Sequence, residues 1–417
     1  MTRDNMPALL AGAAAAATVV SIAAFEILLG LAIVALLLDR KQIRLPPVFV
    51  PLCLWFAGTI VSAMASGGHA GAAWPQVKKF YVYLMLIVVF SAFREIRQIR
   101  ALVLALTAGA ALSSTWSLIQ FARKYQIAKA AHENFYQSYV GSRITGFMGH
   151  WMTFSGHMMI VLLLLGALVL FQAGRRRDGP LLAMELFAGA LITAGLLAAF
   201  TRSMWLGAFA GAVYLIWFWN KRLVLAVPLL AAAALAANPF ALRERAISAF
   251  EPHAGDTDSN EHRVITRRVG YQMIKAHPWF GVGPEEVGPQ FLDYLPADVH
   301  LPLPSGYYGH LHNIYVHYAA ERGLPAVLAL FWMIGQALLD FIRALRRTSA
   351  QSSERWVLHA AIAATLAVLI SGFYELNLGD SEVLGLFLAI MACGYVAVKS
   401  LETLPISTEW KRATAST

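Results

Sequence analysis

Long apolar runs dominate the chain, and short polar segments separate them. A helix that crosses a bilayer needs about 20 mostly apolar residues. The runs predict twelve such helices, at about 7–23, 24–39, 46–66, 72–93, 99–121, 150–173, 180–200, 203–219, 223–240, 324–345, 355–374 and 381–398. Glu26 interrupts the first long run, from Pro7 to Leu38, which predicts a helical hairpin, with one long tilted helix as the alternative.

Composition supports a membrane protein and excludes other classes. Hydrophobic residues make up 58% of the chain and charged residues 14%, against about 45–50% and about 25% in soluble domains. The net charge of +9 comes mostly from Lys and Arg between the apolar runs, which excludes a nucleic-acid partner. Cys53 and Cys393 lie inside apolar runs, which excludes a disulfide framework. The predicted fold class is an all-α polytopic membrane protein with about twelve transmembrane helices.

The basic residues also predict an orientation. More than half of the 33 Lys and Arg lie in one alternate set of mostly short loops. Because such loops stay in the cytoplasm, both termini are predicted to be cytoplasmic. The two longer segments, about 122–149 and 241–323, are then predicted to face outward.

This orientation divides the chain into three parts. Residues 1–240 carry nine predicted membrane helices, 241–323 form a large outer loop, and 324–417 carry three further helices and a short cytoplasmic tail. Within the outer loop, 256–260 predict a coil and Glu261–His277 an amphipathic helix that ends at Pro278. A turn is predicted at Gly281–Pro284.

Arg202 is the sharpest candidate for chemistry. It lies between two apolar runs that almost no loop connects, and a charge held against the bilayer is costly unless it has a function. A guanidinium offers planar, bidentate donors to a phosphate, so Arg202 is predicted to clamp an anion. The alternative is an arginine whose charged end reaches the outer interface.

The predicted outer helix supplies further cations. Arg263 and Arg267 are spaced i, i+4 on one face, and Arg268 and Lys275 follow. Arg263, near the helix start, is better placed to reach a ligand that lies over the membrane. A solvated face is the alternative for Arg267 and Arg268.

Four histidines gather just before the tenth predicted helix: His300, His310, His312 and His317. Their spacing lacks a tight i, i+4 pair or an HExxH pattern, which argues against a metal site. Since imidazole titrates near neutral pH, one of them is predicted to act as a general base beside an arginine pair that holds a phosphorylated leaving group.

Weaker candidates have equally good structural explanations. Lys78 and Lys79 open the fourth predicted helix, and Arg143 precedes the sixth; each could contact phosphate or anchor the interface. Glu375, Asp380 and Glu382 surround a short outer turn and could neutralise an arginine or orient the histidine, or simply make the loop polar.

These elements resemble a known family, the bacterial O-antigen ligases. His312-Asn313, nine residues and Gly323 resemble the family's His-[Asn/Ser/Phe]-x9-Gly signature. The run Thr201–Leu206 resembles its Ser/Thr-Arg-x-x-Trp-Leu element, and Arg263 with His277–Gly283 resembles the segment ending in Pro-x-x-Gly-x-Gly. One departure is Ala326, where the family tends to have Gly, Thr or Tyr. O-antigen polymerases and protein O-oligosaccharyltransferases share the arginine and glycine elements.

The resemblance implies a metal-independent glycosyltransferase of GT-C-type architecture, without a cofactor, at the periplasmic face of the bacterial inner membrane. Its donor would be undecaprenyl-diphosphate-linked O-antigen, and its acceptor the lipid A–core oligosaccharide of lipopolysaccharide. His312 would be the general base, with Asn313 and Gly323 as motif support. Arg202 and Arg263 would bind the diphosphate, with Lys79, Arg143 and Arg267 in second rank.

Three alternatives remain open. An O-antigen polymerase would use a second polyprenyl-linked unit as acceptor, and the His312-Asn313 signature favours the ligase over it. A protein O-oligosaccharyltransferase would need a peptide-binding groove. A twelve-span transporter or flippase would place its charges near the bilayer midplane and would favour internal repeats, which the sequence lacks.

Overall fold

The computed structural model describes residues 5–39, 43–66, 70–172, 179–238, 242–247 and 260–403. Their regular structure is helical throughout, with no strand among the residues described, which confirms the all-α prediction. The helices are α1 Met6–Ala17, α2 Ile22–Leu38, α3 Phe49–Ala65, α4 Ala70–Ala92, α5 Ile96–Ala130, α6 Phe135–Val140, α7 Trp151–Phe171, α8 Gly179–Ala198, α9 Arg202–Asn220, η2 Lys221–Leu225, α10 Ala226–Ala237, α11 Leu242–Ile247, α12 Glu261–Ala276, η4 Phe291–Tyr294, α13 Ile314–Arg347, α14 Arg355–Ser371, η5 Asn377–Gly379 and α15 Ser381–Thr403.

Six described segments are long and apolar enough to cross a bilayer. They are α5, α7, α8, the helical run from α9 to Ala237, α13 and α15. Five further apolar segments are shorter, among them α1, α2, α3 and α14. The chain is therefore a multi-pass membrane protein by helix length and composition, while the count of twelve spans stays a prediction.

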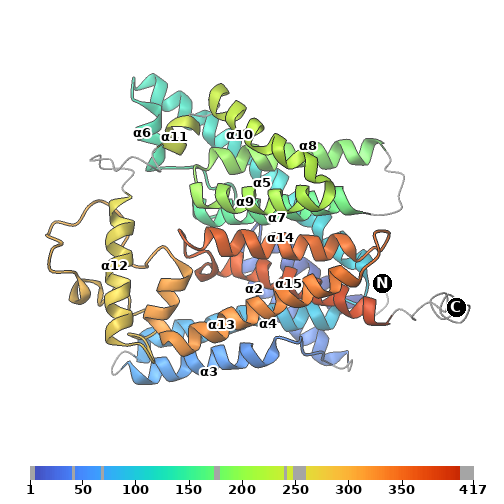
Figure 1. The fold of residues 1–417 in the computed structure, drawn as a ribbon, viewed down its shortest axis with the longest axis horizontal. Helices are drawn as coiled ribbons and strands as arrows, with labels where there is room; N and C mark the ends of the chain where they lie inside the picture. Colours follow the sequence, from blue (N-terminus) through green and yellow to red (C-terminus); the bar gives the residue numbers. More distant parts are fainter. Residues whose placement is uncertain are drawn as a thin grey trace, which may run out of the picture.

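The long helices pack side by side, and α14 lies at their centre (Figure 1). It contacts α7 and α9 on one side and α15 and α13 on the others. Apolar residues cover every face of this helix, from Trp356 to Val368, and nearly all are buried. A helix that is apolar all round belongs in the interior of a bundle.

At the N-terminus, α1 and α2 are two helices packed against each other, which confirms a hairpin over the single long helix. The break lies at residues 18–21, however, and Glu26 lies inside α2, so the predicted position of the interruption is wrong. Two other boundaries differ from prediction. Helix α5 continues to Ala130, past the predicted end at 121. The prediction ended where the apolar run ends, whereas the helix continues through exposed polar residues. Helix α13 starts at Ile314, ten residues before the predicted span, and breaks at Gly323.

The outer segment crosses the ends of the bundle helices, with α12 at one side of the molecule (Figure 1). The amphipathic helix is confirmed: α12 buries Ile265, Val269 and Met273 on one face. This face packs on Leu311 and Val316 to form a small core apart from the main one. Of the predicted coil 256–260, only Asn260 lies within the described residues.

Candidate functional site

A break in α13 receives the glycine-rich loop that follows α12. Gly323 has φ +79°, and a Cβ there would lie 2.2 Å from the carbonyl oxygen of Trp279. The loop pairs with the opened helix: Val282 N–H donates to Ala320 O at 2.9 Å, and Leu324 N–H donates to Pro278 O at 2.8 Å. The two glycine motifs seen in the sequence therefore dock on each other, and this contact fixes the outer loop over the start of α13.

Asn313 ties a second loop to the same place. Its side-chain oxygen accepts the N–H groups of Tyr315 and Val316, both at 2.9 Å, and so caps α13. Its amide nitrogen donates to the carbonyl of Phe373 at 2.9 Å. Because Phe373 lies two residues after the end of α14 and two before Glu375, this bond brings Glu375 beside His312.

Glu375 lies between the two strongest candidates from the sequence. Arg263 Nη2 donates to Glu375 Oε1 at 2.5 Å, and His312 Nδ1 lies 3.6 Å from Oε2. The carboxyl group is 2% exposed. Burial acts to raise its pKa, but the charges of Arg263 and His312 outweigh burial and lower the pKa to about 2. The structure thus holds a buried carboxylate and a buried imidazole beside a partly exposed guanidinium.

The second nitrogen of His312 faces the backbone. Nε2 lies 3.0 Å from the carbonyl oxygen of Tyr307, which can only accept a hydrogen bond. Nε2–H can donate to this carbonyl, while Nδ1 faces the Glu375 carboxylate. His312 also has φ +49°, a conformation that costs a non-glycine residue free energy and is frequent at functional sites.

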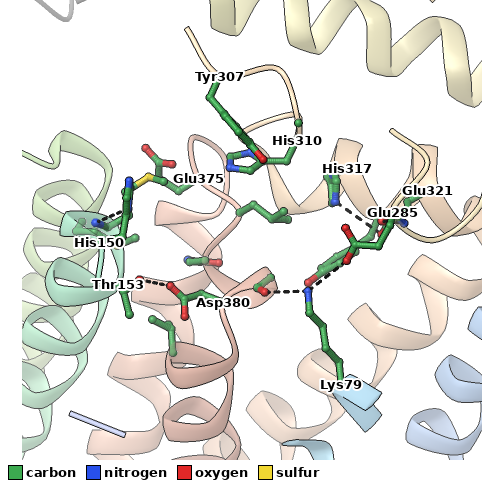
Figure 2. Close-up of a pocket in the computed structure, with 18 of the residues that line it drawn as sticks. Lys79, His150, Thr153, Glu285, Tyr307, His310, His317, Glu321, Glu375 and Asp380 are labelled. Atoms are coloured by element: carbon green, nitrogen blue, oxygen red, sulfur yellow. Dashed lines mark hydrogen bonds and ion pairs between the residues drawn. The ribbon is translucent and has the colours of Figure 1, made fainter. Parts of the chain in front are cut away.

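A cavity of about 290 Å³ lies beside this group (Figure 2). Acidic side chains of Glu285, Glu321 and Glu375 and basic side chains of Lys79, His310 and His317 line it. Lys79 Nζ lies 3.7 Å from Glu285 Oε1 and donates to Gly379 O at 3.3 Å. Burial, with the neighbouring His312, lowers the pKa of His310 to about 2, so His310 stays neutral. The cavity is lined by both acidic and basic side chains.

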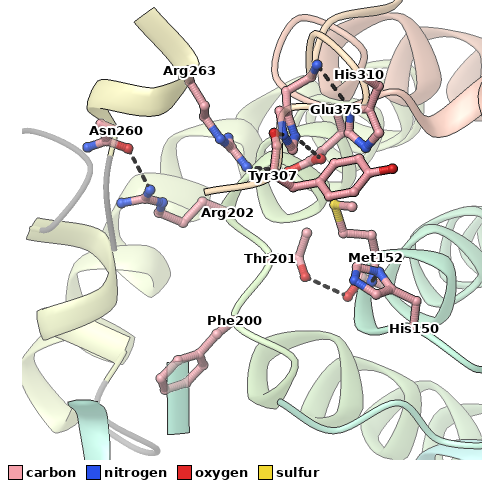
Figure 3. Close-up of polar contacts among 12 residues, drawn as sticks. His150, Met152, Phe200, Thr201, Arg202, Asn260, Arg263, Tyr307, His310 and Glu375 are labelled. Carbon is pink, nitrogen blue, oxygen red and sulfur yellow. Dashed lines mark hydrogen bonds and ion pairs between the residues drawn. The ribbon is translucent and has the colours of Figure 1, made fainter. Parts of the chain in front are cut away.

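Arg202 stands at the first position of α9, near the start of α12 (Figure 3). Its Nη2 donates to the side-chain oxygen of Asn260 at 2.8 Å, three residues before Arg263. Asn260 precedes the first turn of α12, which contains Arg263. The bond to Asn260 therefore holds Arg202, from α9, at the end of α12 where Arg263 lies. Arg202 does not belong to the lining of the cavity as the side chains now lie.

Two second-rank residues occupy other positions. Arg143 donates from Nε to Val140 O at 2.9 Å and from Nη1 to Phe200 O at 3.4 Å, and it stacks over Trp151. It thus holds the backbone just ahead of Arg202. Arg267 lies one turn beyond Arg263 on α12 and is half-buried. Ala326, the departure from the family pattern, packs on Gly58 of α3, where a Cβ on the glycine would lie 2.7 Å from that of Ala326.

Sequence reasoning named Glu375 only as one of three acidic residues, and it missed Tyr307, Glu321 and Arg322. Tyr307 acts through its backbone, which no side-chain pattern reveals. Glu321 and Arg322 are 2% and 4% exposed and pair with each other. Their place nine and ten residues after His312, directly before Gly323, was the available signal.

These features define an all-helical, multi-pass membrane protein. Carboxylate, imidazole, guanidinium and ammonium side chains lie together in it where the outer loop meets the helix bundle. A family model described as O-antigen ligase matches residues 187–331. This match covers about a third of the chain and supports an O-antigen ligase-type family assignment, with a transferase of the general ligase or polymerase type as the coarse function. The matched segment contains Arg202, Arg263 and His312 but ends before Glu375. No curated protein matches the chain.

Proposed function

We propose that this protein is an O-antigen ligase of lipopolysaccharide biosynthesis. It transfers the O-antigen polysaccharide from undecaprenyl diphosphate to a sugar hydroxyl of lipid A–core, at the periplasmic face of the inner membrane. The observation that carries this proposal is the contact of His312 and Arg263 with one buried carboxylate, Glu375. A base and a cation held together suit a reaction that deprotonates an acceptor and releases an anionic leaving group.

His312 is the general base in this proposal. In the reactive complex the acceptor hydroxyl takes the place of the Tyr307 carbonyl at Nε2, and the neutral imidazole carries its single proton on Nδ1, which faces the Glu375 carboxylate. Nε2 removes the hydroxyl proton as the oxygen attacks the anomeric carbon. The bond between this carbon and the diphosphate oxygen breaks on the opposite face, so the configuration inverts. Glu375 stabilises the imidazolium that forms, as a carboxylate does beside a catalytic histidine.

Arg202 and Arg263 bind the leaving diphosphate. Arg263 uses one nitrogen for Glu375, and a guanidinium carries five N–H donors, so others remain for phosphate oxygens. These two charges do the work that a metal ion does in other transferases, which makes the reaction metal-independent. Lys79 is the best supported second-rank contact because it lines the cavity. Arg143 and Arg267 flank the two arginines.

A lipopolysaccharide profile tests this function. Cells that lack the gene are complemented with wild type, Arg202→Ala or His312→Ala. We expect the null strain to make lipid A–core without long ladders while polyprenyl-linked polymer accumulates, and neither variant restores the ladder. Accumulation of single polyprenyl-linked units would identify a polymerase instead. An unchanged profile would indicate another glycan, or transport.

A further inference from the structure

A second cavity, of about 600 Å³, opens on the apolar surface between α3 and α13. Its lining from α3 includes Leu54, Ala57 and Val61, and its lining from α13 includes Leu328 and Trp332. The large side chains of this set are about half exposed or more. An apolar groove on the outside of a membrane helix pair is in contact with hydrocarbon, so its occupant is a lipid chain.

The groove has a built shape. On its floor, Gly58 of α3 and Ala326 of α13 approach so closely that a Cβ on Gly58 would lie 2.7 Å from that of Ala326. Trp279 and Phe280 also line it. These two rings follow Pro278 in the loop that the break at Gly323 receives, so the same glycine that fixes the outer loop also positions these two rings in the groove lining.

Arg322 joins the groove to the polar cavity. It is the one residue that lines both, among the residues described. Its guanidinium lies 4.9 Å from the ring of Trp55 and 5.0 Å from the ring of Tyr318, and it pairs with Glu321. An apolar channel that ends at a buried cation beside a reaction cavity suits a molecule with one long hydrocarbon chain and an anionic head.

We propose that this groove holds the isoprenoid chain of the polyprenyl diphosphate donor, with the diphosphate passing Arg322 into the cavity. The proposal rests on the proposed function. A single groove with a single polar end takes one chain, and the donor has one, whereas the lipid A acceptor carries several acyl chains. Chain length would then set donor affinity through apolar contacts remote from the reacting bond.

Filling the groove tests this assignment. Ala57 is exposed within it, and Ala57→Trp adds a side chain where the isoprenoid would lie. Ala105→Trp, at an exposed position of α5 away from the groove, is the matched control. In proteoliposomes we expect wild type and A105W to show a lower KM for the full-length donor than for a donor with a short prenyl chain. In A57W the KM for the long donor should rise about tenfold, to that of the short donor, with kcat and the acceptor KM unchanged.

Two other outcomes would overturn the proposal. An equal effect of A57W on both donors would mean that the groove does not hold the chain. A rise in the acceptor KM alone would assign the groove to acyl chains of lipid A.

A binding measurement separates this proposal from the proposed function. A photoreactive amino acid replaces Val61 in the groove or, as control, Ile60, which is exposed outside it. We expect sugar-free undecaprenyl diphosphate to cross-link at position 61 and not at 60, even if no transfer to lipid A–core occurs. Equal labelling at both positions would reject the groove, whatever the enzyme's acceptor.

Discussion

One helix and the loop that follows it show two ways to bury a residue. In α14, Ala360 to Ala364 are 2% exposed or less and pack against α7 and α9 through apolar contacts. Glu375, a few residues past the end of this helix, is also 2% exposed but is held by Arg263 and His312. Apolar burial depends on volume and tolerates gradual change. A buried charge depends on each partner, because removing one leaves the other desolvated and unpaired.

The largest effect is expected when His312, the proposed general base beside Glu375, is removed. We expect His312→Ala to lower turnover by about 10²- to 10⁴-fold, the usual contribution of a general base, while the protein still inserts and folds. His300→Ala, at an exposed position of the outer loop, is the control and should keep wild-type turnover. Initial rates of glycan transfer by the purified variants measure both. Normal rates in H312A would remove His312 from the mechanism.

The carboxylate should make stability depend on pH. The pKa of Glu375 is lowered from 4.5 to about 2 in the folded protein. The ion pairs therefore stabilise the fold fully above pH 4.5, and this contribution, about 3 kcal/mol, is lost as the pH falls toward 2. Thermal unfolding from pH 7 to 3 should show a steep loss for wild type and a flatter curve for Glu375→Gln, which is less stable at pH 7. Asp293→Asn, at an exposed position of the outer loop, should keep the wild-type slope. Parallel curves for E375Q and wild type would contradict the pairing.

The glycine break lies between the two regions and offers a matched pair of variants. Gly323→Ala puts a Cβ on a residue with φ +79° and against the backbone of Trp279, so we expect a loss of about 2 kcal/mol. Gly335→Ala, on the same helix, meets nothing within 4 Å and should be neutral or slightly stabilising. Denaturation in detergent compares them. Equal stability of the two variants would mean that the loop does not dock at Gly323.

The smallest effect belongs to the apolar region. Ile362→Val in the middle of α14 removes one buried methyl group, and we expect a cost of about 1 kcal/mol. Turnover per folded molecule should not change, because no charged partner is disturbed. A loss of turnover as large as that in H312A would show that the bundle core and the outer site are not separable in this way.

The sequence predicted the apolar region better than the polar one, and the reason is physical. Hydropathy located α7 and α15 closely because a bilayer imposes both length and composition on a helix. It placed the end of α5 and the start of α13 wrongly, since helices continue through polar residues outside the apolar zone. It predicted α12 from the alternation of buried and charged positions.

For the candidate site, the sequence supplied the residue types and not their partners. His312, Arg263 and Arg202 stood out because each is costly or unusual in its context. Glu375 lies 63 positions after His312, and the bonds from Asn313 to Phe373 and from Ile314 N–H to Gly372 O bring the two together. The contact of His312 with a backbone carbonyl has no sequence signal at all. Such long-range pairings become visible only in the folded chain.

The central claim is that the His312–Glu375–Arg263 group transfers a glycan from polyprenyl diphosphate to lipid A–core without a metal. Purified protein in proteoliposomes, supplied with both lipids and a metal chelator but no nucleotide, tests it most directly. We predict that each new glycolipid is matched by one free polyprenyl diphosphate, that the sugar linkage is inverted, and that H312A makes neither product. Lengthening of the polyprenyl-linked chain while lipid A–core stays unmodified, or transfer that stops when the chelator is added, would contradict the account.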